Sequence, residues 1–321
     1  MSDFVLPSRY KIIDLGTLGG EESIGLAINN RGQVVGRSNT IIEDACNGFL
    51  YDGGRMHNLG TLGGFGSWAY AINDSGQIAG YAQTKYNAAS RAVRWTGAAI
   101  EDIGSLGNRG SFGHDINNYG QVTGFSYPAD SIYLHAFRYA DGKMTDLGTL
   151  GGANSHGYGI NNCGQIAGCA DTEDEEVSHA VIWTETTVTD LGTLGGANSR
   201  ADAINDCGQA TGSSDTISGD DSHAVRWTGT VISDLGSFGG DISLGVGINN
   251  YGVVVGWSFL ADYSRRAFIA PGDTMIDLNT LLLPGSGWIL GSANDINDNG
   301  WITGAGEFNG RTRAYLLVPE D

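Results

Sequence analysis

Residues 155–196 read SHGYGINNCGQIAGCADTEDEEVSHAVIWTETTVTDLGTLGG, and variants of this pattern recur along the whole chain of 321 residues. Within the stretch, four short runs of apolar, β-branched and aromatic residues are separated by turn sequences rich in Asn, Asp and Gly, which is the pattern of consecutive β-strands. None of the four runs is long enough for a helix of ordinary length. The stretch therefore predicts one small antiparallel sheet.

Three landmarks of this stretch return at a fixed spacing. Asp-Leu-Gly or a close variant starts seven times, with five successive intervals of 44 residues and a last one of 43. Ile-Asn-x-x-Gly also occurs seven times, and so does an Ala or Gly followed by Phe, Val or Tyr. A four-stranded unit every 44 residues is typical of the blades of a β-propeller. We therefore predict an all-β, seven-bladed β-propeller with four antiparallel strands per blade, forming a single domain over residues 1–321.

The two ends of the chain complement each other. The seventh repeat supplies three strands, near residues 292–296, 301–305 and 313–318, and the chain ends before a fourth. Residues 9–15 carry the fourth-strand motif with no three strands before it. An open solenoid would instead need atypical capping repeats at both ends. We predict that residues 9–15 form the outer strand of blade seven and close the ring.

The repeated motifs also carry a family resemblance. The triplets His135-Ala136-Phe137 and His179-Ala180-Val181, the heptapeptide DLGTLGG and the Ile-Asn-x-x-Gly-Gln sequence resemble the bacterial HAF-repeat family over nearly the whole chain. Members of that family are described as probable extracellular repeats. The resemblance implies a repeat protein and an extracellular location, and it implies no reaction.

Composition and charge limit the classes of partner. The chain has 17 Lys and Arg against 36 Asp and Glu, a formal net charge of −19, which repels nucleic-acid phosphates. No apolar run approaches the length of a membrane span, and the start MSDFVLPSRYKIIDLG lacks a signal-peptide pattern. Four cysteines are too few for a disulfide scaffold. We therefore expect a monomer with free thiols and a cytoplasmic location, with no nucleic-acid or membrane partner.

Two sets of recurring polar residues have structural explanations. The Asn of Ile-Asn-x-x-Gly stands three residues before a glycine in every repeat, which indicates an Asx-turn closed by a left-handed glycine. A calcium loop would need a carboxylate where this neutral Asn stands. His135, His179 and His223 share one column in which other repeats carry Asn or Arg, so we interpret it as a hydrogen-bonding position. We predict no metal site and no cofactor.

The first strand of each repeat combines invariant and variable positions. In a propeller this strand lies innermost, and successive side chains point to opposite faces of the blade. One set of alternate positions carries Ser, Gly or Ala in the first six repeats, which suits close approach of neighbouring blades. The other set differs between repeats. Together with the nearby Arg109, the candidate ligand-binding and catalytic residues from this set are Trp68, Tyr70, Phe112, His114, His156, Tyr158, Arg200 and Asp202.

These candidates lie near the Gly-Gly crossover between repeats. In an antiparallel blade the divergent second-to-third-strand loops reach the same face, so we predict a site there, over the channel mouth. The leading hypothesis is a binding propeller for a small molecule, glycan or peptide. The alternative is a lyase, cyclase or hydrolase in which His114 or His156 transfers protons, Asp202 orients the histidine, and Arg109 or Arg200 stabilises an anion. A third interpretation is that these large side chains only fill the channel.

Overall fold

Each sequence repeat folds into four strands in the computed structural model, which describes residues 4–42, 44–107, 109–174, 177–185 and 187–320. β-branched and aromatic residues alternate with polar ones along the strands, and turn residues separate them. The first three repeats contain β2 (Gly19–Ile28), β3 (Val34–Thr40), β4 (Cys46–Asp52) and β5 (Arg55–Asn58); β6 (Gly63–Ile72), β7 (Gln77–Thr84), β8 (Ser90–Thr96) and β9 (Ala99–Asp102); and β10 (Ser111–Ile116), β11 (Val122–Ser126), β12 (His135–Ala140) and β13 (Lys143–Asp146).

The later repeats have the same strand order. Two short 3₁₀ helices, η1 (Lys85–Asn87) and η2 (Leu278–Leu281), interrupt the pattern. The strands are β14 (Gly151–Ile160), β15 (Ile166–Thr172), β16 (Ser178–Thr184) and β17 (Thr187–Asp190); β18 (Gly195–Ile204), β19 (Gln209–Thr216), β20 (Ser222–Thr228) and β21 (Val231–Gly236); β22 (Gly239–Ile248), β23 (Val254–Leu260), β24 (Arg265–Ala270) and β25 (Ile276–Asp277); and β26 (Trp288–Ile296), β27 (Ile302–Phe308), β28 (Arg311–Glu320) and β1 (Arg9–Asp14).

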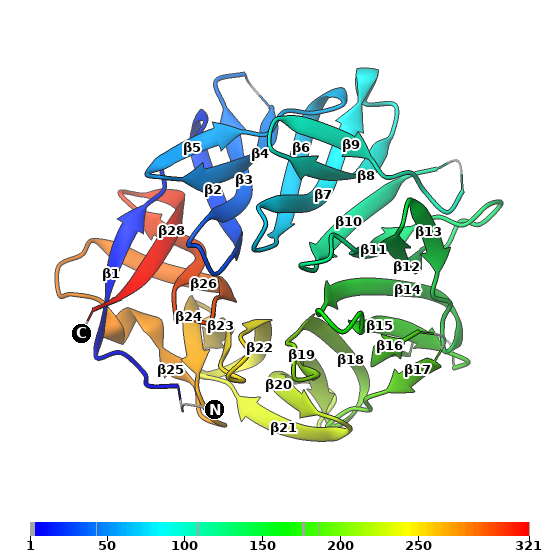
Figure 1. Cartoon of the computed structure of the whole chain (residues 1–321). Coiled ribbons are helices and arrows are strands. Elements are labelled where there is room, and N and C mark those ends of the chain that lie inside the picture. Colours follow the sequence, from blue (N-terminus) through cyan, green and yellow to red (C-terminus); the bar gives the residue numbers. More distant parts are fainter. Residues whose placement is uncertain (1–3, 43, 108, 175–176, 186, 321) are drawn as a thin grey trace.

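The sheets are arranged around a common centre (Figure 1). Hydrogen bonding groups the strands into four-stranded antiparallel sheets, except that one parallel bridge between Ser222 and Ile242 joins the fifth and sixth repeats into a single sheet. The first strand of each repeat contacts the first strands of both neighbours, and β26 contacts β2 in the same way. The first strands therefore surround the centre, as the sequence predicts.

The N-terminal strand completes the last repeat. β1 pairs antiparallel with β28 along its whole length, from Arg9 opposite Glu320 to Asp14 opposite Tyr315. In Figure 1 the blue β1 lies beside the red β28. In the sheet order β1-β28-β27-β26, Arg9–Asp14 is the outer strand beside the three strands of the seventh repeat.

The hydrophobic core lies between adjacent sheets. One cluster joins Ala27 and Val35 of the first repeat to Ile72, Val93 and Trp95 of the second. Another joins Leu15, Val34 and Phe49 to Ala314 and Leu316. Each sheet therefore buries both faces against its neighbours, which explains why the strands carry apolar residues at so many positions.

Glycine permits two local features that other residues would hinder. Gly76 closes a turn with φ of +79°, a left-handed conformation that glycine adopts without steric cost. At Gly80 of β7, a Cβ atom would lie 1.9 Å from the carbonyl oxygen of Trp68, so only glycine allows the two strands to approach this closely. Both positions recur in the other repeats, and together they explain part of the high glycine content.

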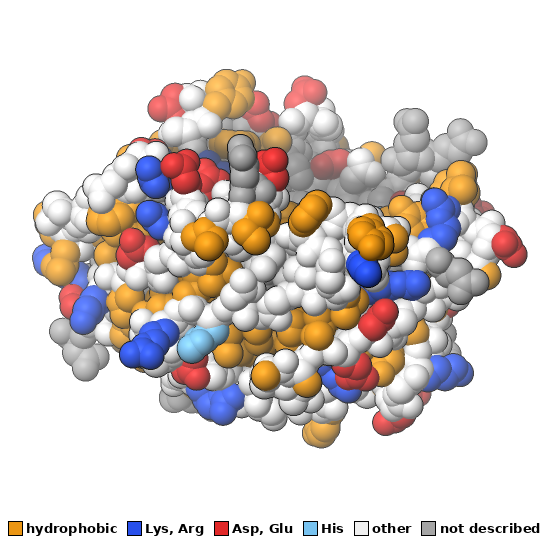
Figure 2. Space-filling view, turned by 90° about the horizontal axis from the view of Figure 1, so that it is seen from above, with side chains coloured by type: hydrophobic (Ala, Val, Ile, Leu, Met, Phe, Trp, Pro, Cys, Tyr) orange, Lys and Arg blue, Asp and Glu red, His pale blue; other side chains and the backbone are white. Residues whose placement is uncertain are grey.

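On the face that Figure 2 shows, positively and negatively charged side chains are scattered among apolar and neutral ones, and neither sign dominates. All four cysteines are free, which confirms the predicted thiols. Within the described residues, no helix is long and apolar enough to cross a membrane.

Candidate functional site

A β-bulge in the inner strand of each repeat positions the candidate side chains. In β6 the register with β7 shifts between Ala69 and Ala71, so Tyr70 is the extra residue. The same shift places His114, Tyr158 and Asp202 at the bulges of β10, β14 and β18. A bulge bends the strand and redirects the side chain of its extra residue. The regular alternation expected from the sequence is therefore interrupted at these positions.

Six of the predicted residues form one continuous cluster. Trp68 and Tyr70 have ring centroids 5.8 Å apart, and Tyr70 stacks on His114 at 4.7 Å. His114 contacts Tyr158 edge-on at 5.1 Å, and Tyr158 stacks on His156 at 5.9 Å. Phe112 joins this aromatic cluster through the second-strand rings of Tyr81 and Phe125. All six side chains are half-buried, so each keeps accessible surface: Trp68, Tyr70, Phe112, His114, His156 and Tyr158.

Both histidines of the aromatic cluster are held in the neutral form. Nδ1 of His114 donates to the carbonyl oxygen of Tyr158 at 3.0 Å, which leaves Nε2 unprotonated. Burial lowers the pKa of His114 to about 4, although this hydrogen bond opposes the change. Burial also lowers the pKa of His156. Neither imidazole carries a charge near pH 7.

The charged candidates pair differently from the sequence prediction. Nη2 of Arg200 lies 2.9 Å from Oδ1 of Asp202, and the guanidinium lies 5.4 Å from the ring centroid of Tyr158. The predicted contact between Asp202 and a histidine has no counterpart among the described residues, because the bulge turns Asp202 toward Arg200. Burial raises the pKa of Asp202, while Arg200 opposes that rise.

Arg109 lies apart from this group. It is exposed, its Nη1 donates to the carbonyl oxygen of Ser131 at 3.0 Å, and its guanidinium lies 4.5 Å from the ring centroid of Tyr127. Among the described residues it makes no hydrogen bond, ion pair or ring contact with the other candidates. The structure therefore does not bring Arg109 to the aromatic cluster.

Sequence reasoning missed a second variable column on the adjacent strand. Tyr81 of β7 contacts Phe112 at 5.1 Å, and Phe125 of β11 contacts His156 at 4.8 Å. Arg37 of β3 lies over Trp68 with its Cζ 4.3 Å from the ring centroid. These residues occupy equivalent positions in successive repeats but differ in type, as the inner-strand candidates do. This variation between repeats could have identified them from the sequence. Each of them bridges its own repeat to the inner strand of the next.

Cys169 belongs to the same second-strand column. Its sulfur lies 4.0 Å from Nδ1 of His156, a pairing that sequence reasoning also missed. Burial raises the pKa of the Cys169 thiol, and burial lowers that of His156. A nucleophilic cysteine requires the thiolate. This pair is therefore a neutral thiol beside a neutral imidazole.

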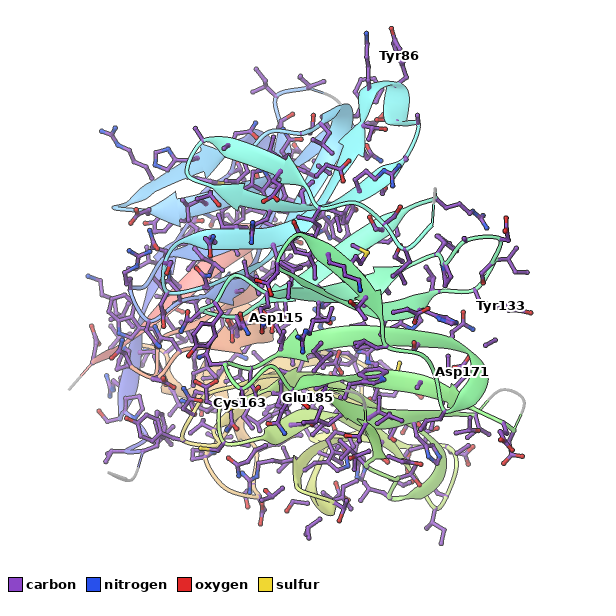
Figure 3. All side chains as sticks on the ribbon, turned by 45° about the vertical axis from the view of Figure 1, so that its right-hand side comes forward. Tyr86, Asp115, Tyr133, Cys163, Asp171 and Glu185 are labelled. Carbon is purple, nitrogen blue, oxygen red and sulfur yellow. The ribbon has the colours of Figure 1, made fainter. Side chains whose placement is uncertain are left out.

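The crossovers and second-to-third-strand loops share one face, as predicted. The amide of Phe65, near the start of β6 and next to the crossover, donates to Oδ1 of Asn87 in such a loop at 2.9 Å. In Figure 3, Tyr86 and Tyr133 of these loops and Asp171 near the end of β15 lie toward one side of the molecule, and Cys163 of an Asn-x-x-Gly turn lies toward the other. The loop tips carry exposed apolar side chains at Ile41, Tyr86, Ile132, Ile217 and Tyr263.

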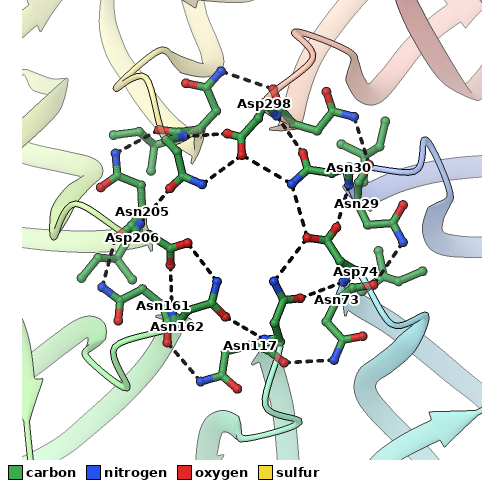
Figure 4. Close-up of a pocket in the computed structure, with 18 of the residues that line it drawn as sticks. Asn29, Asn30, Asn73, Asp74, Asn117, Asn161, Asn162, Asn205, Asp206 and Asp298 are labelled. Atoms are coloured by element: carbon green, nitrogen blue, oxygen red, sulfur yellow. Dashed lines mark hydrogen bonds between the residues drawn. The ribbon is translucent and has the colours of Figure 1, made fainter. Parts of the chain in front are cut away.

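The opposite face has a pocket that the sequence did not predict. This turn-face pocket, of about 200 Å³, is lined by the recurring Ile, Asn and Asn/Asp residues of the turns (Figure 4). Oδ1 of Asn161 accepts from the amides of Cys163 and Gln165, which confirms the Asx-turn. Its Nδ2 donates to the carbonyl oxygen of Asn205 in the next repeat, and equivalent bonds return to the first Asn: Asn29, Asn73, Asn117, Asn161, Asn205, Asn249 and Asn297.

A second row of side chains around the turn-face pocket is also hydrogen-bonded in series. Asn162 donates through Nδ2 to Asp206 at 2.9 Å, and its Oδ1 accepts from the amide of Asn118. The seven members each bond to a neighbour: Asn30, Asp74, Asn118, Asn162, Asp206, Asn250 and Asp298. The polar groups of this pocket are thus engaged with one another. We assign them a structural role.

The predicted histidine column is also structural. Nδ1 of His135 and of His179 each lie 2.8 Å from a carboxylate oxygen of the Asp-Leu-Gly aspartate in the same repeat, and His223 makes the same contact at 3.0 Å. These pairs link the third and fourth strands. The hydrogen-bonding interpretation of this column is therefore confirmed.

Sequence reasoning missed two carboxylates on the inner strands, each next to an isoleucine that lines the turn-face pocket. Asp115 accepts from the amides of Ile116 and Ile160, each at 2.7 Å. Asp295 accepts in the same way from Ile296 and Ile28, at 2.8 Å. Each carboxylate therefore bridges two neighbouring repeats. The other five repeats carry Ala or Gly at this position. An Asp in place of a small residue was therefore the feature of the sequence that could have identified both carboxylates.

The two carboxylates should make stability depend on pH. Burial raises the pKa of Asp115 and of Asp295 to about 7, against an unfolded value of ~4. Between these values the unfolded chain has lost a proton that the folded chain keeps, so the free energy of unfolding falls as pH rises. From pH 5 to pH 6.5 the fall should be about 2 kcal/mol for each carboxylate.

Urea unfolding at several pH values measures this slope. The double variant Asp115→Asn/Asp295→Asn carries neutral side chains of nearly the same shape, so its slope should be smaller than that of the unaltered protein across this window. Asp273→Asn, which removes an exposed carboxylate, is the control. Equal slopes in all three proteins would refute the assignment.

Comparison with known proteins establishes the architecture. The chain matches no protein-family model and no curated protein, so the HAF-repeat resemblance depends on its motifs alone. The β-propeller domain of the Trilobed protease from Pyrococcus furiosus is 9% identical, with a TM-score of 0.62 over 94% of this chain and 97% of that one. The chain is a β-propeller. YCF48, solved bound to D1 peptide, is 12% identical, with a TM-score of 0.53 over 98% of this propeller and 96% of YCF48.

Proposed function

We propose that the chain forms a closed, seven-bladed propeller whose aromatic cluster, on the crossover face, binds a small organic molecule. The pairing of β1 with β28 supports closure. So does the series of Asn hydrogen bonds, which passes through seven turns and returns from Asn297 to Asn29. A closed ring holds every blade between two neighbouring blades, so it presents a rigid frame for the aromatic cluster.

The observation that carries this proposal is the contrast between the two ends of the channel. At the turn face the lining residues are nearly the same in every blade, and their polar groups bond to one another. The aromatic cluster instead differs from blade to blade and combines half-buried rings with a few polar groups. Ligand sites typically consist of apolar and aromatic walls with a few placed polar groups.

Acid–base catalysis by His114 or His156 has less support. A general base works best with a pKa near the working pH, whereas burial lowers the pKa of His114 to about 4. Asp202, expected to orient a histidine, binds Arg200 instead. The neutral Cys169–His156 pair lacks the charge separation of an activated nucleophile. The geometry therefore favours binding over turnover.

A peptide is the second candidate occupant of the crossover face. The exposed loop-tip side chains surround this face, and Tyr86 and Ile217 expose more than four-fifths of their surface. Apolar side chains at loop tips suit a protein or peptide partner better than a small molecule. YCF48, of the same fold, is a propeller solved with a bound peptide. Replacing Tyr86 and Ile217 by Ser would weaken peptide binding and leave small-molecule binding unchanged.

A screen of aromatic fragments by saturation-transfer NMR tests the proposed site. In the double variant Trp68→Ala/His156→Ala, fragment affinity should fall by at least ~10-fold, because the variant loses two rings of the aromatic cluster. The melting temperature should change little, since half-buried residues contribute less packing than core residues. Arg31→Ala/Tyr119→Ala, on the exposed turn face, is the matched control. If only the control variant lost binding, the site would lie at the turn face.

A further inference from the structure

Arg37 differs from the other arginines near the aromatic cluster. It is half-buried, and its guanidinium lies over Trp68, 4.3 Å from the ring centroid. Arg200 is paired with Asp202, and Arg265 donates to the carbonyl oxygen of Gly291. Within the described part of the chain, the Arg37 guanidinium makes neither a hydrogen bond nor an ion pair. Its five N–H donors are therefore available in a protein with a net charge of −19.

Two tyrosine rings lie beside the Trp68 ring that this guanidinium covers. The rings of Tyr70 and Tyr81 are 6.1 Å apart, and each lies within 6 Å of the Trp68 ring. Burial raises the pKa of both hydroxyls, and the positive charge of Arg37 partly opposes that rise. Neither hydroxyl hydrogen-bonds to a described residue, and neither is among the fully buried unsatisfied atoms. Both remain protonated donors near pH 7.

We propose that Arg37, Tyr70 and Tyr81 bind the carboxylate of an aromatic acid. This inference rests on the proposed function, because it names the ligand class of the same crossover-face site. Arg37 contributes a planar fork of donors that matches a carboxylate, and stacking on Trp68 leaves the edge of that fork free. The two hydroxyls add neutral donors. A group of donors with no protein acceptor is complementary to an anion.

The surrounding rings favour an aromatic carboxylate over a strongly hydrated anion such as phosphate. Tyr81 contacts Phe112, and Phe112 contacts Phe125, so an apolar wall continues from the donor group along two blades. Burying a polyanion against this wall would cost more desolvation than burying a single carboxylate. The ligand's ring would contact the wall, and its carboxylate would meet Arg37.

Calorimetric titration with 2-naphthoate and with its neutral analogue 2-naphthamide tests this inference. The unaltered protein should bind naphthoate at least ~10-fold more tightly, because charge-assisted hydrogen bonds form only with the carboxylate. Arg37→Gln should remove this preference by weakening naphthoate about 10-fold, with naphthamide unchanged. Arg37→Lys should retain part of it, since the charge remains and the bidentate geometry is lost. Arg55→Gln, an exposed arginine on β5, controls for net charge.

The outcomes separate this inference from the proposed function. Suppose that the two probes bind with equal affinity, that Arg37→Gln leaves both affinities unchanged, and that Trp68→Ala reduces both. This result would refute the anion site, and it would still support ligand binding at the aromatic cluster. Equal losses in Arg37→Gln and Arg55→Gln would refute the anion site too, because the effect would reflect total charge. Binding of neither probe would refute the aromatic-acid inference, and the fragment screen would then decide the proposed binding site on its own. Melting temperatures of all variants verify that the fold is intact.

Discussion

Removal of residues 1–15 should abolish cooperative folding of the propeller. The deletion takes away β1, which pairs with β28 over six residues, and it removes the buried side chains Tyr10 and Leu15. β28 would then lose its partner strand over residues 315–320 and present an unpaired edge there, which is a template for aggregation. Circular dichroism melts and size-exclusion chromatography should show a broad transition or aggregates.

Restoring the strand distinguishes lost pairing from other damage. A peptide of residues 4–15, added in excess, should bind the truncated chain and recover part of the cooperative melt, since ligand binding to the folded state stabilises it. The inference of closure through β1 would fail if the truncated chain stayed monomeric and melted like the full one.

Substitutions at Tyr10 test the packing of the same strand. Tyr10 is fully buried in a core cluster with Leu278, Trp288 and Tyr315. Tyr10→Ala should lower the free energy of unfolding by about 3–5 kcal/mol, as for other large buried side chains. Its hydroxyl is buried with no hydrogen-bond partner among the described residues, so Tyr10→Phe should not destabilise the protein and can add about 1 kcal/mol.

Asn161→Ala should also cause a large loss, about 3 kcal/mol or more in the free energy of unfolding. The Asn161 side chain accepts from two amides within its turn and donates to the carbonyl oxygen of Asn205 in the next blade. It is almost fully buried, so alanine would leave these groups without partners away from water. Urea unfolding would measure the difference.

Two further variants test the bridging role of Asn161, one at Asn161 itself and one at Asn118 in the second row. Asn161→Asp keeps the acceptor oxygen and loses the donors to Asn205 and Gln165, so its loss should be intermediate. Asn118→Ala removes an exposed member of the second row and should cost less than ~1 kcal/mol. Equal losses for Asn161→Ala and Asn118→Ala would contradict the buried bridging role.

Most of the architecture could be predicted because it depends on neighbours in sequence. The left-handed glycine and the Asx-turn follow from residues two to four positions apart, as at Asn161 and Gly164. The incomplete last repeat and the isolated motif in residues 9–15 predicted the pairing of β1 with β28, because complementary partial repeats leave one strand without partners.

The site could be predicted only in part. Variation between repeats identified Trp68, Tyr70 and His156, and the structure brings them into one cluster. The same test applied to the second strand would have found Arg37 and Tyr81. The pairing of Asp202 with Arg200 could not be read from the pattern, because it depends on a bulge that changes the direction of one side chain.

The sequence by itself determined the repeat, the strand order and the turn chemistry, since these arise from hydrogen bonds and packing within one 44-residue unit. Only the tertiary structure decided which groups meet across neighbouring units: Asp115 with Ile160, Asn161 with Asn205, and Arg37 with Trp68. Those contacts depend on the angle and separation of adjacent sheets. The buried side chains of both sheets set that geometry together, so no single repeat encodes it.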